Sequence, residues 1–112
     1  MPEVYIARTD VFLEETVFRQ GCAAVDSVRL AGVNACRRRE DKARSLCCGL
    51  LLQYAMRRRL RTKKKLELRY GYGTYGKPYF VDEPDMHFSL SHSGAYAAAV
   101  FAPCRAGIDI QC

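Results

Sequence analysis

Apolar and small polar residues alternate strictly from Phe88 to Ser93, a pattern typical of a β-strand with one packed and one polar face. The phenylalanine and leucine of this stretch then face the core, and Ser91 faces the opposite side. A short apolar run at 95–101 predicts a second, buried strand, and Pro103 predicts the turn that follows it. The next alternating stretch, 107–111, predicts a further strand with Ile108 turned to the core.

The clearest helix lies at 39–60, where apolar residues recur every three to four positions. The residues expected on its buried face are Ala43, Cys47, Leu50, Leu51, Tyr54 and Ala55. Arginines and a lysine occupy the remaining arc, so this segment is predicted to pack its apolar face on a sheet. The pattern as a whole indicates an α+β protein.

Weaker signals predict the other elements. Short apolar or alternating runs predict strands at Val4–Ala7 and Leu66–Tyr70. Asp10 is expected to cap a helix over 11–19 that ends at Gly21. A second short helix is expected from Asp26 or Ser27 to about Leu30, with the Gly32 to Asn34 segment breaking the pattern.

Length and composition agree with one folded domain at most. The chain has 112 residues, 49% hydrophobic and 27% charged, which argues against disorder. Six cysteines show no zinc-ligand spacing and read as reduced. No secretory leader or membrane-length segment is seen, so we expect a soluble cytoplasmic protein.

The net charge of +6 indicates anionic partners. A basic tract at 57–65 contributes much of it, and its place at a helix C-terminus favours a solvated helix end. If it is functional, the tract suits either an acidic protein or nucleic acid. Together with seven tyrosines able to stack on bases, it supports a competing interpretation as a small nucleic-acid-binding module, although no recognition motif is present.

Candidate chemistry gathers near the end of the chain. Ser91 and His92, followed by Gly94, can donate several hydrogen bonds to an anion. In the 107–111 strand, Asp109 and Gln111 project from one face two residues apart. Their oxygens suit a hard cation such as Mg²⁺, which prefers carboxylate, water and phosphate ligands. A solvated aspartate on an edge strand is the plain alternative.

Three motifs in order, Tyr-Gly-Lys-Pro at 75–78, Phe-Ser-Leu-Ser-His-Ser-Gly at 88–94 and Gly-Ile-Asp-Ile-Gln at 107–111, resemble the Sfp-type 4′-phosphopantetheinyl transferases. The resemblance extends back through Arg39–Arg44 and covers roughly residues 25–112. It implies half of a two-fold pseudo-symmetric fold, in which one long helix packs on a small, mainly antiparallel sheet. Residues 1–112 would then form the N-terminal subdomain alone.

The resemblance also implies a reaction and its partners. In this family, a serine of an acyl or peptidyl carrier protein attacks the β-phosphate of coenzyme A, and 3′,5′-ADP leaves. Carried over by position, the metal ligands are Asp109 and Gln111, and the catalytic residues are Asp109 and His92. The same comparison assigns coenzyme A contacts to Arg29, Arg44, Gly76, Lys77, Pro78, Ser91 and His92.

Several departures accompany this resemblance. Gln111 replaces the usual glutamate and cannot supply negative charge, and Gly32 stands where a second phosphate-binding base is common. The chain has no tryptophan, whereas the family's second half carries a Trp-x-x-Lys-Glu-Ala motif. We therefore expect an incomplete catalyst: a truncated transferase, a half that pairs with a second chain or with itself, or a non-catalytic coenzyme A binder. An exposed apolar patch on the 88–110 strands would favour self-association.

Overall fold

The computed structural model describes residues 3–72, 78–81 and 86–103. In chain order, the elements are β1 (Glu3–Arg8), a 3₁₀ turn η1 (Asp10–Leu13), α1 (Glu15–Ala24), α2 (Ser27–Ala35), α3 (Arg39–Leu60), β2 (Tyr70–Tyr72), β3 (Pro78–Phe80), β4 (Met86–Ser93) and β5 (Tyr96–Pro103). The predicted α+β class is confirmed, with α3 packed on an antiparallel sheet.

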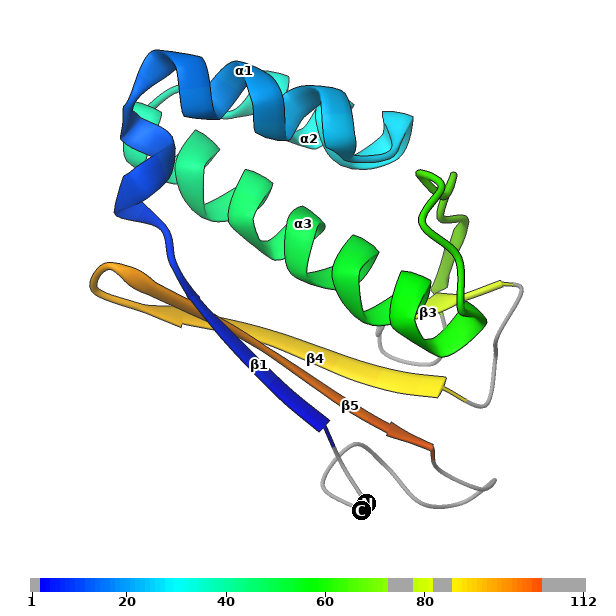
Figure 1. The fold of residues 1–112 in the computed structure, drawn as a ribbon. Coiled ribbons are helices and arrows are strands. Elements are labelled where there is room, and N and C mark those ends of the chain that lie inside the picture. Colours follow the sequence, from blue (N-terminus) through cyan, green and yellow to red (C-terminus); the bar gives the residue numbers. More distant parts are fainter. Residues whose placement is uncertain (1–2, 73–77, 82–85, 104–112) are drawn as a thin grey trace.

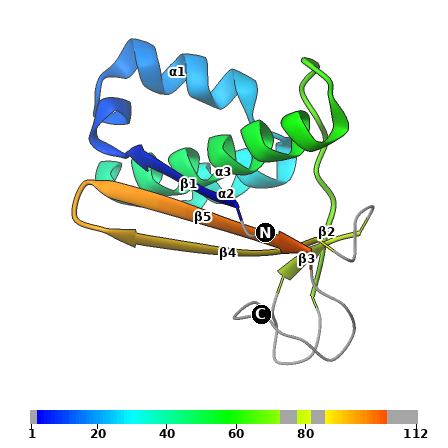
Figure 2. The ribbon, with the colours of Figure 1, turned by 60° about the horizontal axis from the view of Figure 1, so that its bottom comes forward.

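The described elements form three layers, with α1 and α2 on one side of α3 and the larger sheet on the other (Figure 1). This sheet has the order β1-β5-β4, and both pairings are antiparallel. The two-stranded β2–β3 sheet lies near one end of the larger sheet (Figure 2). The long helix is therefore covered on both sides.

Two groups of buried side chains follow from this layering. We call the first the sheet cluster: Cys47, Cys48, Leu51, Leu52, Ala55, Met56, Leu68, Phe80, Met86, Phe88, Ala97, Ala99 and Phe101. We call the second the helix cluster: Val25, Val33 and Leu46, with Leu50 and Phe18 among the half-buried residues packed against it. The sheet cluster includes the predicted buried positions Cys47, Leu51 and Ala55, whereas Tyr54 is exposed.

The β4–β5 hairpin confirms the alternation at 88–93. Phe88 is buried and Ser89 and Ser91 are exposed. Ser93 pairs with Tyr96, so Gly94 and Ala95 form a two-residue connection. Gly94 has φ of +57°, the left-handed region that glycine adopts at no steric cost. Pro103, predicted to lie in a turn, is the last residue of β5.

The start of α1 differs from the prediction. The Asp10 carboxylate is held by Arg8, with Oδ1 and Oδ2 at 3.1 and 2.6 Å from the guanidinium. Glu14 caps α1 instead, because its side chain accepts hydrogen bonds from the backbone N–H groups of Thr16 and Val17. The predicted cap at Asp10 is therefore wrong.

Two glycines predicted to stop helices lie inside them. Gly21 belongs to α1, where an added Cβ would lie 2.9 Å from Leu46 Cδ2, so glycine allows α1 to approach α3 closely. Gly32 lies within α2, which continues to Ala35. A single glycine costs a helix only about 1 kcal/mol, less than the tertiary contacts of these helices supply.

The predicted strand at Leu66–Tyr70 is wrong except at its last residue. Gln53 of α3 takes both backbone groups of Leu66: its Nε2 donates to the carbonyl at 2.5 Å, and its Oε1 accepts from the N–H at 3.1 Å. A segment whose backbone is bound by a side chain has no need of a neighbouring strand.

The sheet face turned away from α3 carries apolar side chains. Val4 and Ile6 of β1 are 59% and 67% exposed, and Tyr96 of β5 is 53% exposed. Strand alternation places Ala98 and Val100 on the same face. Among the described residues, no helix combines the length and apolar character needed to cross a membrane.

Candidate functional site

A cavity of about 150 Å³ lies where the N-terminal end of α3 meets the tip of the β4–β5 hairpin. Its lining residues are Thr9, Asp10, Leu13, Glu40, Ala43, Arg44, Gly94 and Ala95. Its volume suits a phosphate group or a few waters rather than a whole nucleotide. The structure thus brings Arg44, predicted from the sequence, beside the glycine that follows Ser91 and His92.

Arg44 reaches this cavity from the first turns of α3. Its Nη1 lies 3.1 Å from Asp41 Oδ1, and its side chain is 33% exposed. The positive end of the helix favours an anion at this point. A phosphate that entered the cavity would displace Asp41 from the Arg44 guanidinium and form a stronger, bidentate pair with it.

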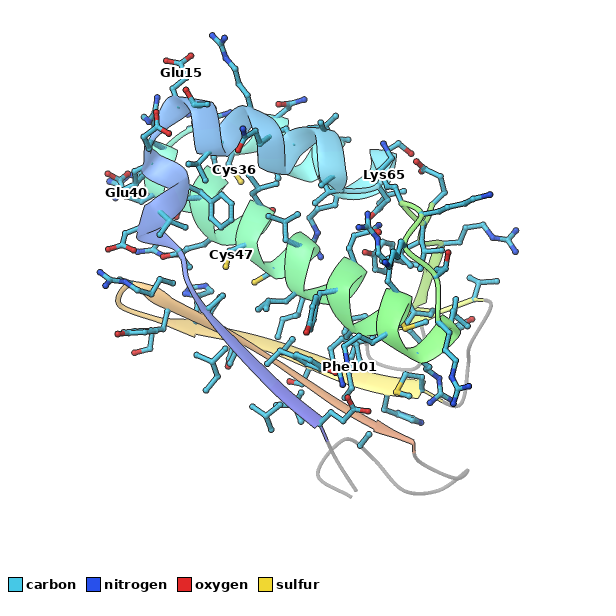
Figure 3. All side chains as sticks on the ribbon, viewed as in Figure 1. Glu15, Cys36, Glu40, Cys47, Lys65 and Phe101 are labelled. Carbon is cyan, nitrogen blue, oxygen red and sulfur yellow. The ribbon has the colours of Figure 1, made fainter. Side chains whose placement is uncertain are left out.

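The cavity also carries carboxylates. Arg8 binds Asp10 and holds the pKa of its carboxyl below the usual value, so this negative charge is already paired. Glu40, in the first turn of α3, lies beside the same cavity, and its position at the N-terminal end of the helix is visible in Figure 3. The sequence analysis assigns neither residue to a binding site, although an acid in the first turn is a recognisable helix-start signal.

Ser91 and His92 lie near the end of β4 and are both exposed. They pair with Ala98 and Ala97 of β5. Because successive residues of a strand point to opposite faces, the imidazole lies on the α3 side of the sheet and the serine hydroxyl on the other. β4 is an edge strand of the described sheet, so a ligand that wraps this edge can contact both side chains.

Arg29 does not meet Arg44. Its side chain runs across α3 at Gly49, where an added Cβ would lie 2.3 Å from Arg29 Cγ. Gly49 follows Arg44 by five residues and therefore faces a direction roughly 140° away around the helix. The structure turns Arg29 toward the protein interior, with its Nε atom buried.

Other basic residues serve helix ends. Lys42 Nζ lies 3.4 Å from the carbonyl oxygens of Val33 and Asn34 in the last turn of α2. Arg57 and Lys65, from the basic tract, contact the last carbonyls of α1 at 3.4 and 3.5 Å, and Figure 3 shows Lys65 near that end of the helix. Cations at helix C-termini satisfy free carbonyls and the helix dipole.

The remaining predicted site residues lie outside the described part of the chain. They are Gly76, Lys77, Asp109 and Gln111. Pro78 begins β3 and pairs with Tyr72, so the 73–77 segment connects β2 to β3. Within the described ranges, no group of three or more His, Cys, Asp or Glu residues is placed to hold a metal. The four described cysteines, at 22, 36, 47 and 48, are free thiols.

Comparison with known proteins places these residues in a family context. No family model matches the chain. Over 79 residues, the chain is 37% identical to the 4′-phosphopantetheinyl transferase Sfp of Bacillus subtilis (strain 168). It is also 33% identical to the 4′-phosphopantetheinyl transferase ffp and 35% identical to another 4′-phosphopantetheinyl transferase, both from Bacillus subtilis.

Each match covers 68% of this chain and 35% of the relative. The chain therefore spans about a third of the length of the curated relatives it matches. Three relatives of one kind, at this level of identity, confirm the resemblance that the motifs predict. Over this segment, the chain is similar in sequence to the Sfp-type 4′-phosphopantetheinyl transferases.

Proposed function

We propose that residues 1–112 form the N-terminal subdomain of a 4′-phosphopantetheinyl transferase and bind the coenzyme A substrate. The observation that carries the proposal is the 79-residue similarity at 33–37% identity. The cavity at the start of α3 supports it, because Arg44 and the tip of the β4–β5 hairpin line one phosphate-sized space. The observed α+β arrangement is compatible with half of a two-fold pseudo-symmetric fold.

In this proposal, the cofactor's phosphates lie along the edge of β4 and the N-terminal end of α3. Arg44 holds a nucleotide phosphate, and the hydroxyl of Ser91 and the imidazole N–H of His92 donate to the pyrophosphate. Lys77, Gly76 and Pro78 line the nucleotide end. Arg29, which points inward, would have to turn outward to reach a phosphate.

The proposed reaction is a phosphoryl-type transfer. The serine hydroxyl of an acyl or peptidyl carrier protein attacks the β-phosphorus of coenzyme A. A serine O–P bond forms, the P–O bond to 3′,5′-ADP breaks, and the proton of the serine hydroxyl passes to solvent. Such reactions depend on positioning and charge neutralisation rather than on covalent help, so the protein's contribution is its array of cationic and hydrogen-bonding groups.

The oxygen ligands of Asp109 and Gln111 fit Mg²⁺ by donor type. When bound, the ion would neutralise charge on the pyrophosphate. With one carboxylate and one amide, this pair would hold the ion less tightly than two carboxylates. A second half of the fold, from a longer chain, another chain or a second copy, would cover the outer sheet face around Val4 and Ile6 and complete the catalytic site.

Calorimetric titration of the chain with coenzyme A and Mg²⁺ tests the proposal. We expect His92→Ala and Asp109→Ala each to weaken binding roughly tenfold, since the first removes a hydrogen bond to a phosphate and the second removes a proposed Mg²⁺ ligand. Lys63→Ala, a change in the basic tract, is the matched control and should bind as wild type does. Absence of heat with a folded wild-type sample, or equal loss with Lys63→Ala, would contradict the proposal.

A further inference from the structure

Near the N-terminal end of α2, three buried polar atoms have no hydrogen-bond partner among the described residues: Asp26 Oδ1, Arg29 Nε and the Tyr70 hydroxyl. Asp26 is completely buried and caps α2, because its Oδ2 accepts from the Arg29 backbone N–H at 3.1 Å. Native proteins leave few buried polar groups unpaired, and each one costs free energy. Three together call for a common explanation.

These groups act on one another. The pKa of Tyr70 is raised to about 12, mainly by burial and then by the Asp26 carboxylate, whereas Arg29 works in the opposite direction. An acceptor, a cationic donor and a hydroxyl therefore lie within mutual electrostatic reach. They are also chemically complementary, since one carboxylate oxygen can accept from both N–H and O–H donors.

The path of Arg29 into this cluster depends on Gly49. A Cβ at that position of α3 would lie 2.3 Å from Arg29 Cγ and 2.9 Å from Cδ. Glycine in a helix interior costs about 1 kcal/mol relative to alanine. The gap that it leaves holds the aliphatic part of Arg29 against α3, which fixes where the guanidinium can lie.

Tyr70 links this cluster to the small β2–β3 sheet. It begins β2 and pairs with Phe80 of β3, and its ring centroid lies 5.7 Å from that of Phe80 and 6.4 Å from that of Phe88. Strands of three residues are only marginally stable by themselves. The placement of this hairpin therefore depends on side-chain contacts such as those of Tyr70.

We propose that Asp26, Arg29 and Tyr70 form a buried hydrogen-bond network that positions the β2–β3 hairpin against α2 and α3. The Tyr70 O–H and Arg29 Nε–H both donate to Asp26 Oδ1. All three are positioning residues. Pro78, the first residue of β3, is a proposed coenzyme A contact, so the link from this network to coenzyme A rests on the proposed function.

The network itself is tested by hydrogen exchange with Tyr70→Phe, which removes the hydroxyl and keeps the ring. We expect amide exchange in β2 and β3 to accelerate roughly tenfold, with α3 unchanged. Tyr5→Phe is the matched control, because it removes an exposed hydroxyl that donates to Glu3. Unchanged exchange in the hairpin of Tyr70→Phe would overturn the network whether or not the chain binds coenzyme A.

Titration of the phenolate absorbance gives a second readout. The difference between wild type and Tyr70→Phe isolates Tyr70, and Asp26→Asn, which keeps a capping side chain, should lower the pKa of this hydroxyl toward the ordinary value of 10. An unaltered titration in Asp26→Asn would overturn the contact between them. If Asp26→Asn does not fold, the hydrogen-exchange measurement on Tyr70→Phe still tests whether the network exists.

The link to coenzyme A is tested separately. We expect Tyr70→Phe to weaken coenzyme A binding several-fold, whereas Tyr5→Phe leaves it unchanged. Faster hairpin exchange combined with wild-type affinity would overturn the link between this network and coenzyme A binding. A wild-type chain that binds no coenzyme A would overturn this link along with the proposed function. The hydrogen-exchange result would still test the network itself.

Discussion

The two sides of α3 are buried against different partners, and the contacts differ in kind. Toward the sheet, the helix contributes Cys47, Leu51 and Ala55 to a large apolar cluster. Toward α1 and α2, the apolar cluster is small, and close approach depends on glycine: Gly49 of α3 receives the side chain of Arg29, and Gly21 of α1 lies against Leu46. The sheet side depends on buried area, whereas the helical side depends on specific geometry.

The most disruptive test of this comparison uses two leucines of α3 that are both fully buried. Leu52 belongs to the sheet cluster and Leu46 to the helix cluster. We expect Leu52→Ala to lower the free energy of unfolding by about 4 kcal/mol and Leu46→Ala by about 3 kcal/mol, because the smaller cluster collapses more easily around a cavity. Urea denaturation measures both. A larger loss at Leu46 would reverse the comparison.

Two glycines test whether the contact between α2 and α3 depends on close geometry. Gly49→Ala places a methyl group against Arg29, so we expect a net loss of about 1–2 kcal/mol despite the better helix propensity of alanine. Gly32→Ala is the control, because nothing lies within 4 Å of its added Cβ. That change should stabilise the protein by about 0.5–1 kcal/mol. Stabilisation by both, in thermal unfolding, would show that Arg29 does not need the gap.

Gln53 tests a third kind of contact, a polar one between α3 and the segment that follows it. Gln53→Leu preserves volume but leaves both backbone groups of Leu66 without this partner, so we expect a loss of about 1–2 kcal/mol. Gln20→Leu, at an exposed position of α1, should change stability far less. If the two substitutions had equal effects on chemical denaturation, Gln53 would be acting only through its apolar part.

On the sheet side of α3, we expect a smaller effect on the free energy of unfolding, which is confined to alkaline pH. Burial raises the pKa of Cys47 from 9.0 to about 11, so the folded state keeps a proton that the unfolded state releases. The stabilisation is complete below pH 9 and is lost as the pH rises toward about 11. In denaturation at several pH values, Cys47→Ala should flatten this decline. An identical alkaline slope in the variant would refute the assignment.

The sequence predicts the sheet side better than the helical side. Alternation at 88–93 and the three-to-four spacing at 39–60 follow from which side chains are buried. The predicted strand and helix are both confirmed, as β4 and α3. Leu46 and Leu52 were missed because a helix covered on both sides no longer shows one apolar stripe. Periodicity cannot reveal that Gln53 substitutes for a strand at Leu66, or that Glu14 caps α1 because Arg8 holds Asp10.

The sequence likewise predicts some residues of the candidate site better than others. Arg44 was assigned from the resemblance, and the structure places it beside Gly94 at a cavity. Sequence position gives no direction for a long side chain, so the inward course of Arg29 through the Gly49 gap could not be foreseen. The roles of Lys77, Asp109 and Gln111, outside the described residues, stay predictions.

The most direct test of the central claim is a map of amide chemical-shift changes when coenzyme A and Mg²⁺ are added to the labelled chain. We predict that the largest changes occur at the N-terminal turns of α3 around Arg44 and at His92, Gly94 and Ala95. Little change is expected in the basic tract at 57–65, which lies at the other end of the helix. Changes centred on that tract, or none in a folded sample, would contradict a coenzyme A site at the hairpin tip.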